Sequence, residues 1–290
     1  MTLCGQEQIG RARNRAGGWR FSGVFRRLGL AALITAALAP ASWAHPGHHG
    51  SGLVGWWTFD DGNAALATDS SGLGNDGVLG GGAVPTTDAV RGKALDFTDD
   101  DAQVTIPFDP SLQPATGTIE VWVKVDTPQN SDIFVAVSDC AIRTDPTCAN
   151  VIGISVIGLR IQADGGAHAF IADDHAPDDP WAFATAPAGL ITLGRWHHLA
   201  MRWDGAKLAL FVDGFLRDTT SYDAIPGSGL SYHGDSDMYL GVGTASFLPE
   251  PHEFIGQMDD VRFYSRARSW VDIFTDYVTR GRTPAKAFGH

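Results

Sequence analysis

The sequence predicts an all-β fold, a sandwich of two antiparallel sheets that ends with one short helix. Many short apolar runs alternate with turn-forming residues, and glycine alone accounts for 35 of the 290 residues. Helical periodicity is nearly absent. A strongly apolar hairpin over residues 194–214 needs a second sheet to cover it, because a lone hairpin is marginally stable in water. Short strands separated by turns in this way are typical of sandwiches.

Residues 1–44 have the pattern of a signal peptide. A basic stretch with six arginines precedes the apolar run of residues 28–39, and Ser42 and Ala44 place small residues at the −3 and −1 positions. The apolar run is too short to span a bilayer. We therefore expect no membrane span and a secreted or periplasmic protein. An arginine pair just before the apolar run leaves twin-arginine export open beside ordinary secretion.

Residues 45–52 are predicted to be a flexible lead-in rich in histidine and glycine. Cleavage after Ala44 would expose His45 as the amino terminus, and a free amine with imidazoles can hold copper or zinc. Pro46 argues against this, because proline has no amide proton to release for chelation. A tail without fixed structure is therefore the favoured interpretation, with a weak metal site as the alternative.

Charge and cysteine content limit the partners and the compartment. The net charge is −12 at pH 7, and removal of the basic N-terminus would leave a still more acidic chain. An acidic surface repels nucleic acid and anionic lipid, so neither is an expected partner. It attracts divalent cations, or it serves only to keep the protein soluble. Cys140 and Cys148 are expected to form a local disulfide in an oxidising compartment.

Residues 53–280 are predicted to form one sandwich domain, followed by a loose tail over residues 281–290. The expected strands, in order, are 53–60, 93–98, 102–107, 117–126, 133–137, 151–162, 167–172, 195–203, 207–212, 238–243 and 254–265. The clearest of them alternates so that Ile119 faces the core while Glu120 and Trp122 face away. Trp122 is then either an outward platform for a ligand or a side chain covered by a loop.

The hairpin of residues 194–214 alternates in the same way. His197 and His198 therefore point to opposite faces of the sheet, and they cannot act together as an acid and a base. Asp204-Gly205 is expected to make the tight turn, because glycine accepts the positive φ that a primed turn needs.

Polar loops separate the predicted strands. Residues 68–77 are dense in Asp, Asn, Ser and Gly, which is typical of turns. Two of the predicted loops are long enough to carry function. They are the acidic, proline-broken residues 173–189 and the polar residues 227–237. A capping box over residues 269–272 predicts a short helix near the end of the domain.

Six pieces of the sequence, taken in order within residues 53–278, have a recognisable pattern. They are LVGWWTFDDG, DSSGLGNDG, KALDF, TIEVWVKVD, GRWHHLAMRWDGAKLALFVDG and FIGQMDDVRFYSRARSWVDI. Together they resemble the laminin-G-like family of the concanavalin A-like lectin/glucanase superfamily. The resemblance implies a jelly roll with one concave and one convex sheet. It also implies binding of a glycan or an extracellular protein at the concave face or the rim.

The resemblance further implies a structural calcium ion that ties the first strand to the last. The matching positions are Asp60, after the first strand, and Asp259, in the last, while Asn75 and Asp76 are candidates to complete the shell. Two carboxylates brought together repel each other unless a cation bridges them, and calcium takes oxygen ligands of this type. The alternative is that Asp60 and Asp259 simply accept hydrogen bonds from turns or sheet edges.

Hydrolysis is not the expected activity. The resemblance implies that a glucanase of this superfamily would carry Glu-x-Asp-x-x-Glu on one concave strand. Retaining glycosidases need their two carboxylates about 5 Å apart. Beyond residue 44 the glutamates are Glu120, Glu250 and Glu253, and none of them begins that motif. The sequence therefore favours a non-catalytic, lectin-like binding module.

The candidate ligand-binding residues are aromatic or can form hydrogen bonds. Trp181, His175 and Tyr232 lie in the predicted long loops, and Trp122 lies on a strand; aromatic rings stack on the apolar faces of sugars. Trp181 is alternatively an anchor that pins its loop to the sandwich. Two other functions stay open, namely a divergent polysaccharide-acting enzyme that uses loop carboxylates or His45, and a structural or assembly protein of the cell surface.

Overall fold

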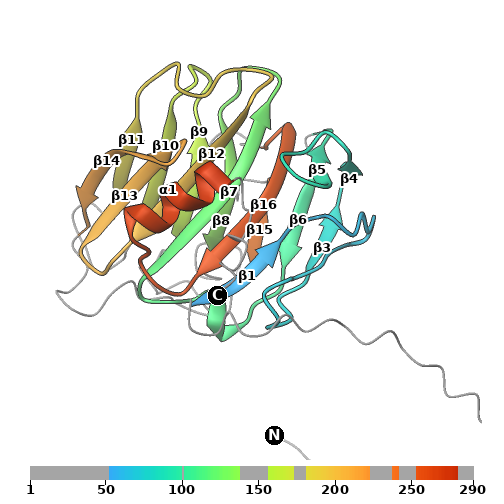
Figure 1. Cartoon of the computed structure of the whole chain (residues 1–290), viewed down its shortest axis with the longest axis horizontal. Helices are drawn as coiled ribbons and strands as arrows, with labels where there is room; N and C mark the ends of the chain where they lie inside the picture. The colour runs from blue at the N-terminus through green and yellow to red at the C-terminus, as the bar shows by residue number, and fades with distance from the viewer. Residues whose placement is uncertain are drawn as a thin grey trace, which may run out of the picture. The chain divides into compact units, whose positions relative to one another are not determined.

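The computed structural model confirms a jelly-roll sandwich of two antiparallel sheets (Figure 1). It describes residues 52–99, 101–137, 156–172, 181–222, 237–241 and 253–279. The predicted signal peptide, the C-terminal tail, and both Cys140 and Cys148 lie outside these ranges, as does all of the lead-in except Gly52. Within the ranges, no helix is both long and apolar enough to cross a membrane.

The first sheet, sheet A, contains the first and last strands of the domain side by side. Its strands are β1 (Leu53–Trp57), β4 (Ala83–Thr86), β5 (Ala94–Phe97), β7 (Gly117–Val125), β12 (Trp196–Trp203), β13 (Lys207–Val212), β14 (Phe215–Ser221) and β16 (Gly256–Tyr264). Their order is β14-β13-β12-β7-β16-β5-β4, and β1 pairs with β16. The two ends of the domain are thereby held together by backbone hydrogen bonds.

The second sheet, sheet B, packs against sheet A and ends at strand β11. Its strands are β2 (Leu66–Ala67), β3 (Gly77–Gly80), β6 (Gln103–Ile106), β8 (Ser131–Val137), β9 (Val156–Ile161), β10 (Ala167–Ala172), β11 (Trp181–Ala186) and β15 (Met238–Leu240). Their order is β11-β10-β9-β8-β15-β6-β3-β2. A short 3-10 helix, η1 (Pro110–Leu112), links β6 to β7.

The core lies between the two sheets, where alternation along the strands places the aliphatic side chains. On β7, Ile119, Val121, Val123 and Val125 are all buried in it, as the sequence predicts. Trp203 of β12 is fully buried, and its ring centroid lies 5.9 Å from that of Phe263. Burial of one such large apolar side chain contributes about 1.5–3 kcal/mol, so this layer dominates the stability of the sandwich.

The predicted hairpin is confirmed, but a primed turn forms at Asp213-Gly214 and not at Asp204-Gly205. β12 and β13 pair antiparallel around Asp204-Gly205, where the glycine has a φ of 92°. A type I′ turn needs positive φ at both central residues. Asp213 (53°) and Gly214 (75°) meet that condition, and they connect β13 to β14, a polar strand that the sequence pattern did not reveal.

One predicted loop contains a strand. Residues 173–189 were expected to be irregular, yet β11 runs through the middle of this segment and forms an edge of sheet B. Its inward side chains are the alanines Ala182, Ala184 and Ala186. Because alanine is a weak apolar signal, the alternation of this strand is hard to see in the sequence.

The predicted helix is confirmed as α1 (Trp270–Thr279), which lies across the outer face of sheet A (Figure 1). Its capping box forms as expected: the Ser269 N–H donates to Asp272 Oδ2, and the Asp272 N–H donates to Ser269 Oγ, both at 3.2 Å. Ile273 is buried in a small apolar cluster with Ala200, Ala209 and Phe211 of sheet A. The outer face of sheet A is thus partly covered, which bears on the site below.

Candidate ligand-binding site

An aromatic strip lies on the outer face of sheet B, across strands β10 and β11. It consists of His168 and Phe170 from β10 and Trp181 and Phe183 from β11. These positions alternate with the buried alanines of the same strands and therefore point away from the core. Phe170 lies directly opposite Phe183 in the strand register. The sheet edge thus gathers four rings from residues up to fifteen positions apart.

Three rings of the strip are in mutual contact. The ring centroids of Trp181 and Phe183 lie 6.0 Å apart with planes only 13° from parallel. The centroid of Phe170 lies 6.1 Å from that of Trp181 and 6.2 Å from that of Phe183. Phe170 is buried, whereas Phe183 is 44% exposed. Phe170 therefore supports the pair from below, and Phe183 and Trp181 form the accessible surface.

A glycine determines how the supporting ring lies. Gly158 of β9 is the register partner of Phe170. A Cβ atom built on Gly158 would lie 2.0 Å from Cζ of Phe170, a separation that real contacts do not show. The tip of the ring consequently lies close against the backbone of β9, and the rings of Trp181 and Phe183 contact it. The glycine is needed for this close approach rather than for a turn.

Polar groups border the strip on the β9 side. The guanidinium of Arg160 lies 5.4 Å from the centroid of the Phe170 ring, and Gln162 Nε2 lies 3.5 Å from His168 Nδ1. Burial and the positive charge of Arg160 lower the pKa of His168, against the opposing effect of Asp164. A neutral imidazole offers one donor and one acceptor. The strip therefore combines apolar ring faces with hydrogen-bonding groups, as sugar binding requires.

The predicted ligand-binding residues do not all lie where the sequence places them. Trp181 belongs to the strip, although it begins an edge strand instead of lying in a loop. His175 and Tyr232 lie outside the described residues, and their roles stay predictions. Phe183, Phe170 and Arg160 were not identified from the sequence, because only the pairing of β9, β10 and β11 brings them together.

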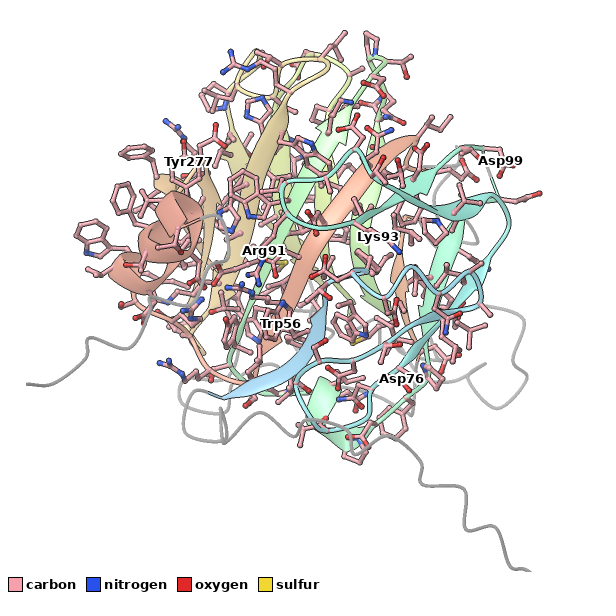
Figure 2. All side chains as sticks on the ribbon, turned by 45° about the vertical axis from the view of Figure 1, so that its right-hand side comes forward. Trp56, Asp76, Arg91, Lys93, Asp99 and Tyr277 are labelled. Atoms are coloured by element: carbon pink, nitrogen blue, oxygen red, sulfur yellow. The ribbon has the colours of Figure 1, made fainter. Side chains whose placement is uncertain are left out.

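Trp122 is not an outward platform, and this prediction was wrong. Its side chain is only 5% exposed, because α1 covers it: the ring centroids of Trp122 and Tyr277 lie 5.8 Å apart with planes 20° from parallel. The alternative of a covered side chain holds, with a helix as the cover in place of a loop. Tyr277 is labelled on the helix in Figure 2.

Glu120 belongs to a group of buried charges beneath α1. This side chain is 1% exposed, and Arg268 bridges it to Asp276 of the helix. Burial raises the pKa of Glu120, but the close contact with His198 and the charge of Arg268 outweigh it and lower the pKa overall. His198 Nε2 lies 3.3 Å from Glu120 Oε2, without the alignment of a hydrogen bond. Glu120 thus holds α1 against the sheet and does not face a substrate.

His197 takes part in a hydroxyl–imidazole–carboxylate arrangement on the other face. Thr192 Oγ1 lies 2.9 Å from His197 Nε2, and His197 Nδ1 lies 2.9 Å from Asp213 Oδ2. His197 Nε2 also accepts the backbone N–H of Thr192 at 3.0 Å. The lone pair that would activate the hydroxyl is therefore engaged by the backbone. The arrangement fixes two turns, and the predicted separation of His197 from His198 is confirmed.

The predicted calcium ligands fall into two groups. Asp60 Oδ1 accepts the N–H of Lys93, and Asp259 Oδ2 accepts the N–H groups of Val90 and Arg91. Both carboxylates thus hold the segment between β4 and β5. Burial, together with the charges of Asp260 and Asp60, raises the pKa of Asp259 to about 7. Figure 2 shows Arg91 and Lys93 on this segment over sheet A.

Asn75 and Asp76 lie in a different hydrogen-bond network, centred on Asp69. Asp76 Oδ1 accepts the N–H of Asp69 at 2.7 Å, and Asp69 Oδ2 accepts the N–H of Asn75 at 3.0 Å. The Asn75 side chain donates to the Val54 carbonyl at 2.7 Å. Asp76 lies well apart from Lys93 in Figure 2, so the structure does not gather the four predicted ligands.

The donor set suits a hard cation only in part. Asp60 Oδ2 and Asp259 Oδ1 carry no hydrogen bond from the described residues, and they belong to neighbouring acidic side chains. Calcium takes six to eight oxygen ligands, so carbonyl groups and water would have to supply most of the shell. The described residues contain no group of three or more His, Cys, Asp or Glu side chains that could hold a metal ion.

Comparison with solved structures supports the fold. Domain 4 of AbnA, a GH43 extracellular arabinanase from Geobacillus stearothermophilus solved with arabinotriose, aligns at a TM-score of 0.55 and 17% identity, over 77% of this chain and 97% of that chain. The binding domain of Paraclostridial mosquitocidal protein 1 gives 0.58 and 13%, over 79% and 52%. Trypanosoma rangeli sialidase with sialic acid gives 0.58 and 16%, over 79% and 33%.

The coverage limits what these similarities mean. This chain spans about half of the toxin binding domain and a third of the sialidase, and identities of this size show a common fold alone. A comparison with curated proteins gives no match. The family Laminin_G_3, described as the concanavalin A-like lectin/glucanases superfamily, matches residues 98–274. By this match, and by its two-sheet jelly roll, the chain belongs to the concanavalin A-like lectin/glucanase superfamily.

Proposed function

We propose that this protein is a secreted, non-catalytic carbohydrate-binding domain that holds a glycan on the aromatic strip of sheet B. The observation that carries the proposal is the nearly parallel pair of Trp181, which is partly exposed, and Phe183, which is 44% exposed. Aromatic side chains of this size are normally buried, and their exposure on a flat sheet marks a surface that a ligand covers.

The chemistry of the strip favours a saccharide over an apolar ligand. A sugar ring presents C–H groups on its faces and hydroxyl groups around its edge. The rings of Trp181 and Phe183 suit the faces, while Arg160, Gln162 and His168 offer donors and acceptors for the hydroxyls. A similarly folded arabinanase domain was solved with arabinotriose, which supports a saccharide as the ligand class.

Secretion is proposed from the sequence. The basic N-terminus, the short apolar run and the small residues before Ala44 have the order of an export signal. A secreted domain without its own catalytic carboxylate pair would act by attachment, keeping a cell or a larger assembly in contact with a polysaccharide.

Calcium at Asp60 and Asp259 is proposed as a structural ligand and not as part of the sugar site. The support is the repulsion of Asp259 by Asp260 and Asp60, both of which raise the pKa of Asp259. A bound cation would remove this repulsion and fix the segment between β4 and β5, to which both Asp60 and Asp259 are hydrogen-bonded.

A titration calorimetry series tests the sugar site. The full chain is screened on a panel of neutral oligosaccharides that includes arabinan, xylan, galactan and glucan fragments. For the best ligand, Phe183→Ala and Trp181→Ala should each weaken binding about tenfold or more, because a stacking ring contributes on the order of 1–1.5 kcal/mol beyond its buried area. Phe215→Ala, which removes an exposed ring from sheet A, is the matched control and should leave the affinity unchanged.

Three results would count against the proposal. Binding of no oligosaccharide on the panel, by a protein with a cooperative thermal transition, removes the glycan as ligand class. Binding that both Phe183→Ala and Trp181→Ala retain places the sugar elsewhere on the molecule. Release of reducing sugar from the panel would replace the binding function with hydrolysis.

A further inference from the structure

A groove lies on the opposite side of the sandwich from the aromatic strip. It has a volume of about 680 Å³ and is formed by strands β12, β13 and β14 of sheet A and by the segment of residues 266–272 that leads into α1. Pockets that hold small ligands have volumes of about 300–1,000 Å³, so the groove has the size of a binding site. All its lining residues belong to the described part of the chain.

One wall of the groove is aromatic and open to solvent. Trp270 is 62% exposed and Phe215 is 53% exposed, and Leu216 beside them is exposed as well. Phe274 of α1 supports both rings, with centroids 5.5 Å from that of Phe215 and 6.4 Å from that of Trp270. An exposed tryptophan that a second ring holds in place is a contact surface prepared for a ligand.

The rest of the groove is basic, in contrast with the acidic chain. Four basic side chains and two acidic ones line it, whereas the whole chain has a net charge of −12 at pH 7. The basic residues are Arg202, Lys207, Arg266 and Arg268. The charge of Arg268 is already balanced by Glu120 and Asp276 and is not counted on for the ligand. A local excess of positive charge on an acidic protein attracts anions.

The two acids of the groove are already engaged. Asp204 Oδ2 binds Arg202 Nη2 at 3.0 Å, while its Oδ1 accepts the N–H groups of the following turn. Asp272 caps α1. By contrast, no ion pair among the described residues involves Lys207, and Arg202 uses only Nη2. The positive charge of Lys207 is therefore available to a ligand.

From this groove we infer a second binding site, for an oligosaccharide that carries carboxylate groups, such as a chain of uronic acids. The Trp270 and Phe215 rings stack on the sugar faces, and Lys207 and Arg202 bind the carboxylates, whose planar geometry suits a guanidinium. β14 is the edge strand of sheet A, where a peptide could add as a further strand. Such addition is disfavoured, because Asp218 of β14 already accepts the N–H of Thr185 in β11 at 2.8 Å. The inference concerns a different surface from the proposed neutral site and does not depend on it.

The test is a binding titration of the full chain with three matched anionic or neutral probes. They are an oligogalacturonate, the same oligomer after methyl esterification, and an oligoglutamate of similar length and charge. The oligogalacturonate should bind at least about tenfold more tightly than either of the other two, since only it offers both sugar rings and carboxylates. Its affinity should fall when salt is raised from about 0.05 M to about 0.5 M, because exposed charges are screened.

Variants locate the site on the groove. Trp270→Ala and Lys207→Gln should each weaken oligogalacturonate binding, by about tenfold and about threefold respectively. Arg195→Gln, an exposed cation outside the groove, and Phe183→Ala, in the aromatic strip, are the controls and should leave this affinity unchanged. Thermal transitions within about 2 °C of the unaltered protein establish that each variant is folded.

Each contrary result has a definite reading. Equal binding of the methyl ester would show that charge is not recognised, and equal binding of oligoglutamate would convert the groove into a site for acidic peptides; either one overturns the inference. Oligogalacturonate binding that is lost in Phe183→Ala but kept in Trp270→Ala would assign the acidic sugar to the aromatic strip. Absence of binding by all three probes also overturns it, without affecting the neutral site.

Discussion

At the residue scale, the buried charges of sheet A are the most sensitive part of the molecule. Glu120, Arg268 and Asp276 form a chain of ion pairs between β7 and α1 with hardly any access to water. At the surface, water and salt screen the same attraction, as in the partly exposed pair of Arg202 and Asp204. Burial therefore decides how much each pair matters.

Replacement of Glu120 by Gln should destabilise the domain by about 3–5 kcal/mol, because Arg268 would then lose the more deeply buried of its two carboxylate partners. Urea unfolding followed by tryptophan fluorescence measures the change. Asp204→Asn is the matched control at the surface and should cost less than about 1 kcal/mol. Similar losses for the two variants would show that the Glu120 network contributes no more than a surface pair.

Asp259 gives a pH dependence with a defined sign. Its pKa is raised from 3.8 to about 7, first by burial and then by neighbouring acids. The folded chain therefore binds a proton more tightly than the unfolded chain does, so this stabilisation is present below pH 3.8 and is lost as the pH rises through about 7. In chelator, the stability advantage of Asp259→Asn over the unaltered protein should grow between pH 5 and pH 8, by up to about 1.4 kcal/mol per pH unit.

Asparagine keeps the oxygen that accepts the N–H groups of Val90 and Arg91, so the comparison isolates the charge. Urea titrations of both proteins at each pH supply the difference in the free energy of unfolding. A difference that stays constant across this range would mean that Asp259 is already ionised in the folded chain at pH 5.

At the scale of secondary-structure elements, sequence patterns identify strands with large inward side chains and miss those with small ones. Residues 117–126 and 207–212 were predicted because isoleucine, valine or leucine occupies every second position. β11 was missed because alanines face its core side, and β14 because most of its side chains are exposed. The local sequence also predicted the α1 capping box. It did not predict that α1 covers Trp122, because that contact depends on the packing of distant segments.

The candidate site was predictable only in part for the same reason. Trp181 could be singled out as an aromatic residue in a polar segment. Its neighbours Phe170, Phe183 and Arg160 come from strands whose register is set by hydrogen bonds between β9, β10 and β11. No sequence spacing expresses that register, so the strip became visible only in the folded sheet.

The packing of β9 against β10 gives a prediction about the strip as a unit. Gly158→Ala should tilt the Phe170 ring, destabilise the domain by about 1–3 kcal/mol, and weaken glycan binding through Phe183 and Trp181. The double variant with Phe170→Leu should recover stability, because a smaller side chain leaves room for the new methyl group. Equal stability of Gly158→Ala and the unaltered protein would contradict the close contact of Phe170 with the β9 backbone.

At the scale of the whole molecule, the two outer faces of the sandwich differ. The outer face of sheet B carries the aromatic strip, whereas α1 and the segment between β4 and β5 cover much of sheet A (Figures 1 and 2). The proposed functions are accordingly distributed: a neutral glycan on sheet B, an acidic glycan beside α1, and a structural cation where the first and last strands meet.

A thermal melt with and without calcium tests the cation. A ligand that binds only the folded state raises the melting temperature, and we expect a rise of several degrees in the unaltered protein with millimolar calcium. Asp60→Asn should abolish the rise. Asp76→Asn, in the separate network around Asp69, should retain it. A rise that survives Asp60→Asn would place the ion elsewhere, and no rise at all would remove calcium from the account.

The central claim is that the aromatic strip binds a glycan. Its most direct test is a nuclear magnetic resonance titration of the isotope-labelled chain with the oligosaccharide that binds best in calorimetry. We predict that the largest shift changes occur at the amides of β10 and β11 and at the indole N–H of Trp181, with little change in α1. Shift changes confined to α1 and β14, or absent from β10 and β11 at saturation, would contradict it.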